Sequence, residues 1–187
     1  MKKTQRLLAL LLALVMALSL AACGAQSAPA EDENTAPETR VFTDSVGREV
    51  TVPAQIDKVA LSGPMAQIVL FALCPDKLVG IANAWDESAA QYLDTAYYNL
   101  PLLGQLYGGK GELNLETLLQ SGAQVVIDVG EQKDGMADDL NALQEQTGIP
   151  FVHIDCYTAT MGDTYRALGT LLGKETDADF AAKNPNV

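Results

Sequence analysis

The stretch KVALSGPMAQIVLFALCPDKLVGIA, residues 58–82, decides the fold. Short apolar runs at Lys58–Ser62 and Lys77–Ala82 each predict a strand, and Pro64 suits the first position of a helix between them. The apolar stripe of this helix is predicted to comprise Met65, Ile68, Val69 and Ala72. A strand, a helix and a second strand in this order are typical of a parallel sheet.

The same alternation continues along the chain, and RVFTDSVGREVTVP (residues 40–53) precedes it as a predicted β-hairpin. The further predicted elements are strands at Gln124–Gly130 and Pro150–Asp155, and helices at 113–122, 136–148 and from Thr160, where Thr160 and Asp163 suggest a capping box. Near-continuous apolar strands separated by helices indicate an α/β fold with a Rossmann-like parallel sheet flanked by helices.

The first residues indicate export. MKKTQR is cationic, and the 14-residue apolar run Leu7–Leu20 is too short to span a membrane, so residues 1–22 read as a signal peptide. The run ends in LAAC, which looks like a bacterial lipobox and predicts cleavage before Cys23 and acylation of that residue. The alternative is an ordinary signal peptide with a chance cysteine. Residues 23–39 are polar and acidic and are predicted to be a disordered tether to the outer face of a membrane.

The net charge excludes two classes of partner, and the positions of the cysteines bear on disulfide formation. Removing residues 1–22 leaves nine basic against 24 acidic residues, a net charge of −15, which repels nucleic acid and anionic lipid headgroups. Cys74 is predicted to end a helix and Cys156 to follow a strand at the other edge of the sheet. Because a disulfide requires close Cα atoms, we expect two free thiols.

The segment GQLYGGKG, residues 104–111, has the G-x-x-x-x-G-K spacing of a phosphate loop. A phosphate loop needs a Ser or Thr after the lysine, and Gly111 stands there instead. ATP is also not available outside the cytoplasm. Catalysis has little support, since the single histidine, His153, lies within an apolar strand and no G-x-S-x-G turn is present. A single histidine gives little support for a transition-metal site, a carboxylate-rich metal site stays open, and no cofactor is expected.

Ligands of open parallel sheets bind beyond the carboxyl ends of the strands. The loops there carry aromatic faces, amides such as Gln67 and Gln132, and lysines including Lys133. These residue types favour a recognition surface over an active site. The predicted ligand contacts are Ser62, Met65, Asn83, Trp85, Tyr107, Lys110, Glu131 and Tyr157.

The lipobox, the hairpin TDSVGREVTVP, the strand–helix stretch above, NLETLLQSGAQVVIDVG and GIPFVHID occur together in this order. In this the chain resembles the substrate-binding lipoproteins of ABC importers for iron complexes, which carry ferric siderophores, haem or cobalamin. The resemblance covers residues 40–173 and implies one lobe of a two-lobe fold with the ligand between the lobes. It also implies that Glu116, with Glu112 as the nearby alternative, docks onto ABC permease subunits. A first-turn glutamate is equally a favourable anion at a helix N-terminus.

The resemblance would require a second lobe after residue 173. Residues 174–187 are instead expected to be a truncated stub of the inter-lobe helix. Two other functions stay open at this point. One is an extracytoplasmic α/β enzyme, for which Ser62 or Asp86 would have to act, and the other is a ligand-free scaffold lobe that docks on a permease.

Overall fold

The computed structural model describes residues 38–107 and 112–184. An antiparallel hairpin comes first, formed by β1 (Thr39–Thr43) and β2 (Glu49–Pro53). It confirms the hairpin predicted over residues 40–53. Its inward residues Val50 and Val52 are almost fully buried, whereas their neighbours along β2 are exposed, so the alternation expected of a half-buried strand is present.

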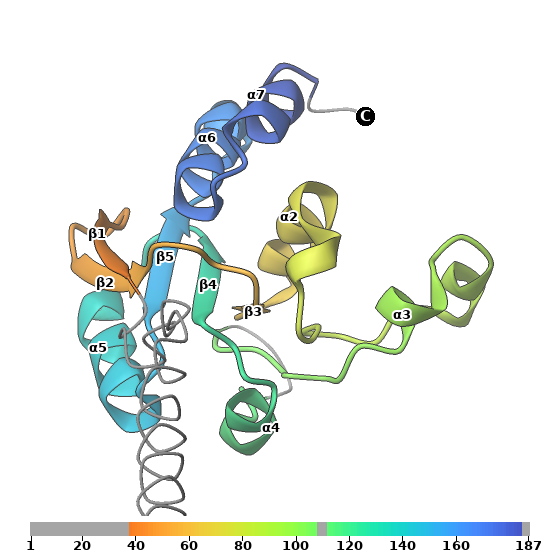
Figure 1. Ribbon diagram of the computed structural model, residues 1–187, viewed down its shortest axis with the longest axis horizontal. Helices are drawn as coiled ribbons and strands as arrows, with labels where there is room; N and C mark the ends of the chain where they lie inside the picture. The colour runs from red at the N-terminus through yellow and green to blue at the C-terminus, as the bar shows by residue number, and fades with distance from the viewer. Residues whose placement is uncertain (1–37, 108–111, 185–187) are drawn as a thin grey trace, which may run out of the picture. The chain divides into compact units, whose positions relative to one another are not determined.

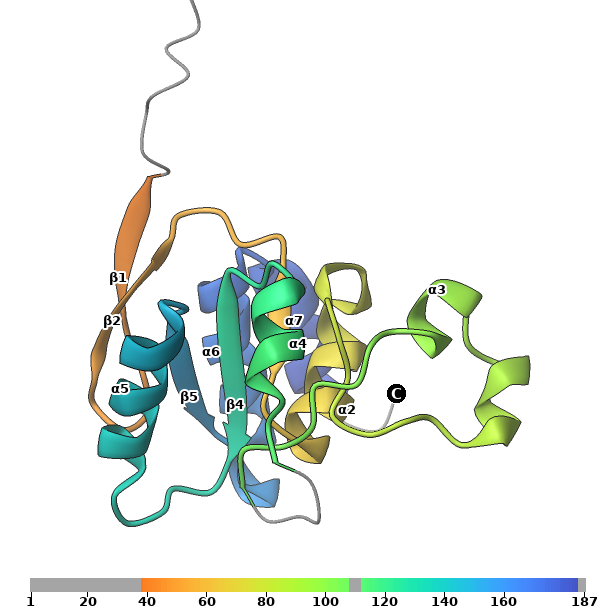
Figure 2. The same cartoon turned by 90° about the horizontal axis from the view of Figure 1, so that it is seen from below.

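The main sheet has three parallel strands in the order β3 (Val59–Leu61), β4 (Val125–Gly130) and β5 (Phe151–Asp155). The register pairs Ala60 with Val126 and Val126 with Phe151. Helices cover both faces (Figures 1 and 2): α2 (Pro64–Leu73), α6 (Met161–Leu172) and α7 (Glu175–Lys183) on one, α4 (Leu115–Gln120) and α5 (Met136–Thr147) on the other. The predicted α/β class with a helix-flanked parallel sheet is confirmed.

The core is divided by the sheet into two layers, because successive strand residues face opposite sides. Leu61, Ile127 and Ile154 face α2 and α6 in the larger layer. Ala60, Val126 and Phe151 face α4 and α5 in the smaller one. Every residue of β3 and nearly every residue of β4 and β5 is buried, which explains why these strands appear in the sequence as continuous apolar runs.

The strand predicted at Lys77–Ala82 is not formed. This segment contains a short 3-10 helix, η2 (Pro75–Lys77), and then makes only isolated parallel bridges, from Leu78 to Val59 and from Ile81 to Leu102. Gly80 lies between the two bridges, and a Cβ atom there would come 2.6 Å from the side chain of Leu103. The close approach of Leu103 leaves no space for a side chain at position 80.

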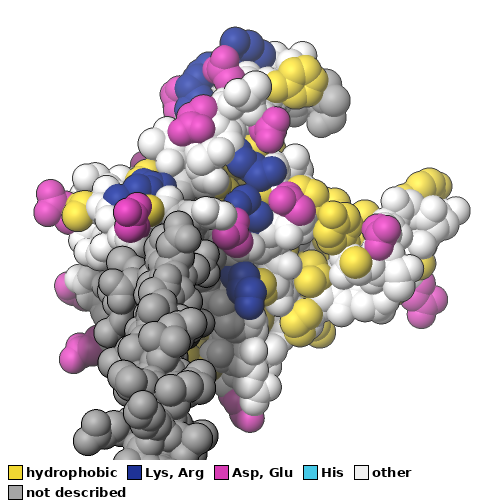
Figure 3. All heavy atoms as spheres, viewed as in Figure 1, with side chains coloured by type: hydrophobic (Ala, Val, Ile, Leu, Met, Phe, Trp, Pro, Cys, Tyr) yellow, Lys and Arg dark blue, Asp and Glu magenta, His cyan; other side chains and the backbone are white. Residues whose placement is uncertain are grey.

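The predicted apolar stripe of α2 was also wrong in part. The helix begins at Pro64 as expected and buries Val69, but its other buried apolar residues include Ala66 and Leu70. Of the predicted stripe, Met65 and Ile68 are 45% and 65% exposed, and Ala72 is exposed as well. The helix carries apolar residues on all of its sides, so sequence periodicity alone did not identify its inner face. Figure 3 shows the consequence, with apolar surface gathered at α2 and the segment that leads to α3.

Two short helices follow α2, η3 (Glu87–Gln91) and α3 (Thr95–Tyr98), and both views place them beyond α2, away from the sheet (Figures 1 and 2). A further 3-10 turn, η4 (Thr158–Thr160), precedes α6. The predicted capping box is not formed, since the Thr160 side chain makes no capping hydrogen bond to the helix. None of the helices in the described residues is long and apolar enough to cross a membrane.

The chain reverses direction after α6 at Gly173, which adopts φ 67°. Helix α7 then packs against α6, where a Cβ atom on Gly169 would lie 2.5 Å from that of Ala178. The predicted break near Gly173 is therefore present. The origin of residues 174–187 as a stub of an inter-lobe helix stays a prediction. Cys74 and Cys156 are buried and free, as expected.

Candidate ligand-binding site

A shallow pocket of about 150 Å³ lies at the carboxyl ends of β3 and β4. It lies where ligands of open parallel sheets bind. Its lining residues are Ser62, Gly63, Pro64, Met65, Tyr107, Asp128, Val129, Gly130, Glu131, Lys133 and Met136. Four of the eight predicted contacts line it, namely Ser62, Met65, Tyr107 and Glu131.

The other predicted contacts do not line this pocket. Asn83 is exposed, and its backbone is held by Gln67 of α2, whose side chain accepts hydrogen bonds from the N–H groups of Ala82 and Asn83 at 2.9 and 3.0 Å. Gln67 is thus buried for a structural reason. Tyr157 is 41% exposed outside the pocket lining. Lys110 and Cys23 lie outside the described residues.

Trp85 is part of an aromatic cluster beside α2. Its ring lies 5.1 Å from that of Phe71 in an edge-on arrangement, and Phe71 contacts Tyr97 in the same way at 5.7 Å. The indole N–H donates to the carbonyl of Tyr97 at 3.3 Å. These contacts fix the segment between α2 and α3, so the structure gives Trp85 a packing role.

The pocket floor contains a polar network that sequence reasoning missed. Ser62 donates its hydroxyl hydrogen to Oδ1 of Asp128, and Oδ2 of Asp128 lies 2.7 Å from Nδ1 of His153. Nε2 of His153 lies 3.1 Å from Oδ1 of Asp155. His153 is completely buried, and Ser62 and Asp128 are 2% and 8% exposed. A buried charge of this kind requires such partners.

The strand register explains why these side chains meet. Asp128 pairs directly with His153 across β4 and β5, and Ser62 follows β3 one row beyond the pair Ala60–Val126. All three therefore project from the same face of the sheet, next to the apolar row Ala60, Val126 and Phe151. The signal in the sequence was one polar residue at the same position near the carboxyl end of each apolar strand.

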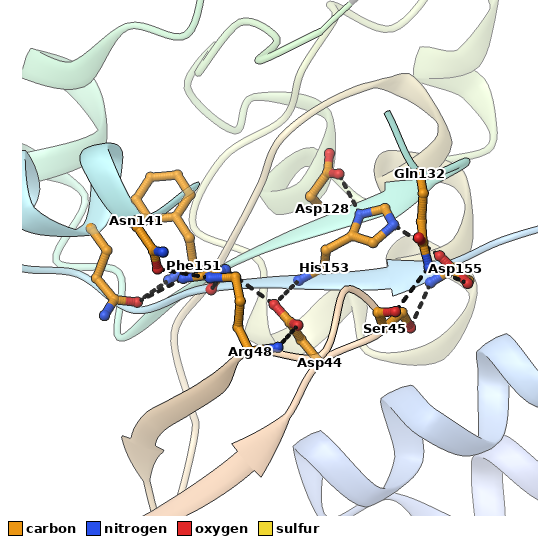
Figure 4. A network of polar contacts seen from close by, with 10 residues as sticks. Asp44, Ser45, Arg48, Asp128, Gln132, Asn141, Phe151, His153 and Asp155 are labelled. Carbon is orange, nitrogen blue, oxygen red and sulfur yellow. Dashed lines mark hydrogen bonds and ion pairs between the residues drawn. The ribbon is translucent and has the colours of Figure 1, made fainter. Parts of the chain in front are cut away.

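The hairpin turn completes the network from the other side (Figure 4). Ser45 accepts a hydrogen bond from the side chain of Gln132 through its carbonyl at 2.8 Å, and its hydroxyl accepts from the N–H of Asp155 at 2.9 Å. Gln132 also donates to Asp155 at 2.9 Å. The turn before β2 thereby fixes the end of β5 that holds His153 and Asp155.

A buried ion pair anchors the same turn. Arg48 contacts Asp44 at 3.0 Å, and the two side chains are 9% and 0% exposed. Arg48 also donates to the carbonyl of Phe151 at 3.0 Å and to Asn141 of α5 at 2.9 Å. The ion pair therefore links the hairpin to both β5 and α5.

The wall of the pocket is formed by Tyr107. The ammonium of Lys133 lies 4.1 Å from the centre of its ring, a cation–π contact, and its hydroxyl donates to Asp139 at 3.3 Å. Burial, followed by the charge of Asp139, raises the pKa of Tyr107 to about 12. The phenol therefore stays neutral at every physiological pH.

The arrangement does not contain the elements of a serine hydrolase. A Ser-His-Asp triad places the imidazole between the serine and the carboxylate, whereas here the carboxylate of Asp128 lies between Ser62 and His153. Asp86 caps η3, and its hydrogen bonds from Ser88 lower the pKa of its carboxyl group. Within residues 38–107 and 112–184, no group of three or more His, Cys, Asp or Glu side chains is placed to hold a metal ion.

The predicted docking residues are both on the surface. Glu116 lies in the first turn of α4, where Asn114 caps the helix by accepting from the N–H of Thr117 at 2.9 Å. Its carboxylate accepts from Gln120 at 3.2 Å and is exposed. Glu112 is exposed as well. Exposure is what docking requires, but it does not by itself assign that role.

Comparison with known proteins defines the class to which this fold belongs. No family model and no curated protein matches the chain. Among solved structures, the chain is similar to an ABC transporter solute-binding protein from Sulfurospirillum deleyianum, with a TM-score of 0.66 and 21% identity over 77% of this chain and 45% of that one.

Two further structures have known ligands. The molybdate-binding protein MolA of Haemophilus influenzae, bound to molybdate, gives a TM-score of 0.58 at 18% identity over 77% of this chain and 49% of that one. SirA of Staphylococcus aureus, complexed with staphyloferrin B, gives a TM-score of 0.56 at 19% identity over 78% of this chain and 46% of that one. The chain thus spans less than half the length of each. Its described part has the fold of one lobe of these solute-binding proteins, which are not enzymes.

Proposed function

We propose that this chain is the extracytoplasmic substrate-binding component of an ABC importer for iron–siderophore, haem or cobalamin-type ligands, held to the cell membrane by a lipid on Cys23. The observation that carries the proposal is the pocket at the carboxyl ends of β3 and β4, in a lobe with the fold of solute-binding proteins. Residues 40–173 would supply the N-terminal lobe and, with it, one wall of the ligand cleft.

The composition of the pocket supports binding rather than catalysis. It combines an aromatic face, Tyr107, and an exposed thioether, Met65, with a small number of polar groups. Such a mixture provides contact area and orientation for a small ligand. At about 150 Å³ it is smaller than the roughly 300–1,000 Å³ of complete ligand sites, as expected of one wall of a cleft.

Titration of the purified protein with ferric siderophores, haem and cobalamin tests the proposal. We expect one of these classes to bind, and Tyr107→Ala to weaken binding at least about tenfold because the variant loses the aromatic wall. Tyr92→Ala is the matched control, since Tyr92 is 82% exposed and lies outside the pocket. Absence of binding by all three classes, or equal affinity in the two variants, would contradict the proposal.

Docking on the permease is assigned to Glu116, with Glu112 as the alternative. An exposed carboxylate can pair with a cation of a partner without first breaking a buried contact, and Glu116 meets that condition. Glu116→Arg should therefore abolish co-purification with the permease. Glu145→Arg makes the same charge change at an exposed position of α5 and should leave co-purification intact. Retained co-purification of Glu116→Arg would exclude this residue, and loss in Glu112→Arg would assign the alternative.

A further inference from the structure

We propose that the floor of the pocket accepts hydrogen bonds and carries negative charge, so that it selects ligands whose buried face presents hydrogen-bond donors or is neutral to cationic. This inference rests on the proposed function, because it specifies the class of ligand for the same pocket.

The orientation of the Ser62 hydroxyl is fixed by Asp128. A serine hydroxyl has one hydrogen to donate and two lone pairs. Ser62 gives its hydrogen to Asp128, and both residues line the pocket. Only lone pairs of the Ser62 oxygen therefore remain for a ligand. The hydroxyl, which could in principle donate to an oxyanion, is fixed as an acceptor.

The charge of the pocket floor comes from Asp128 and the residues behind it. An ionised carboxylate is an acceptor only, and Asp128 uses one oxygen for Ser62 and the other for His153. Behind it, His153 is shared with a second carboxylate, that of Asp155. With both carboxylates ionised, even a doubly protonated imidazole leaves this group of three side chains with a net charge of −1. Burial strengthens the effect of that charge on a ligand in the pocket.

The wall of the pocket, like its floor, offers hydrogen-bond acceptors. The Tyr107 hydroxyl donates to Asp139, so its oxygen also offers lone pairs. Among the described lining residues the cation is Lys133, which is exposed at the rim and placed over the Tyr107 ring. Lys133 is accessible to water there, and its influence on a ligand at the floor is screened accordingly.

One feature of the pocket favours the opposite polarity. The first turn of α2, at Gly63–Met65, borders the pocket, and no acidic residue occupies that turn. A helix N-terminus corresponds to about half of a positive elementary charge. The carboxylate of Asp128 carries a full negative charge and also lines the pocket, so the negative contribution is the larger one.

Iron chelates of different charge provide the test with the unaltered protein. Three hydroxamates neutralise Fe³⁺, and a linear ferric trihydroxamate with a pendant ammonium group is cationic, whereas three catecholates leave a strongly anionic complex. Calorimetric titration should rank the ammonium-bearing trihydroxamate at least about tenfold above the ferric tris-catecholate, equivalent to about 1.4 kcal/mol. Molybdate, the ligand of MolA, should not bind.

Asp128→Asn tests whether the charge of Asp128 causes this ranking of the two chelates. The substitution keeps the size and an oxygen that can accept from Ser62 but removes the charge, so the ratio of the two affinities should fall toward one. Asp134→Asn, an exposed position outside the pocket lining, is the matched control and should leave the ratio unchanged. A thermal melt of each variant establishes that it is folded.

The outcomes separate the two proposals. Binding of the tris-catecholate or molybdate in preference to the trihydroxamate overturns this inference but leaves the receptor function standing. Absence of binding by these chelates and also by haem and cobalamin overturns both. If Asp128→Asn does not fold, the ranking measured with the unaltered protein still decides, because it requires no variant.

Discussion

The ion pair between Asp44 and Arg48 should contribute far more to stability than any pair on the surface. Both side chains are almost fully buried, at 0% and 9% exposure. Asp44→Ala leaves the guanidinium without its counter-ion and removes the acceptor for the N–H of Arg48, which lies at 2.8 Å. Breaking a buried pair in this way costs about 3–5 kcal/mol. The free energy of unfolding of a domain is about 5–15 kcal/mol, so Asp44→Ala should remove a large fraction of the total stability.

Asp57→Ala is the matched control, because Asp57 pairs with Lys77 at 3.1 Å and is 56% exposed. A surface pair of this kind is worth about 0–1 kcal/mol. Urea unfolding followed by circular dichroism measures both variants, and the midpoint of Asp44→Ala should fall with little change in slope.

A double variant isolates the buried charge as the cause. Asp44→Ala combined with Arg48→Met removes both charges and keeps an apolar chain in place of the arginine stem. It should be more stable than Asp44→Ala alone, because no unpaired charge then remains inside. Midpoints that are equal for Asp44→Ala and Asp57→Ala, or a double variant less stable than the single one, would refute the reasoning.

Two other predictions concern backbone space and thiol chemistry. Gly104→Ala should cost at least about 1–3 kcal/mol in urea unfolding, since φ is 80° and the new Cβ would lie 2.2 Å from the carbonyl oxygen of Glu112. Gly47→Ala, with φ 81° and open space, should cost less, and equal losses would contradict the steric argument. Burial raises the pKa of Cys74 to about 12, so its stabilising effect is complete below pH 9 and is lost as pH rises toward 12. Cys74→Ala should therefore flatten the alkaline decline of stability, and an unchanged decline would exclude Cys74 as its source.

Periodicity predicted the elements that carry continuous apolar runs. The strands β3, β4 and β5 and the helices between them lie where the sequence places them, because burial on both faces requires apolar residues throughout. The prediction failed at Leu78–Ile81, where an apolar run forms bridges rather than a strand. Leu78 and Ile81 bridge to different segments, and Gly80 between them closely approaches Leu103, which lies 23 positions further along the sequence. A local pattern does not reveal such an approach.

The position of the pocket was predictable, but its polar contacts were not. The rule that ligands bind at the carboxyl ends of parallel strands selected Ser62 and Tyr107, and both line one pocket. The same rule selected Trp85, because it is an aromatic residue that follows an apolar run. Only the ring distances to Phe71 and Tyr97 show that Trp85 packs against its own chain.

The row formed by Ser62, Asp128 and His153 is difficult to explain by stability alone. The neighbouring row on the same face, Ala60, Val126 and Phe151, is apolar and fully buried. Replacing a buried ionic network by packed apolar side chains is often neutral or stabilising. A lobe selected only for stability could therefore have continued the apolar row to the end of each strand. The polar row occurs instead at the strand ends where the pocket opens, and two of its three members line that pocket. The position of the network, rather than its energy, is what supports its proposed role in ligand recognition.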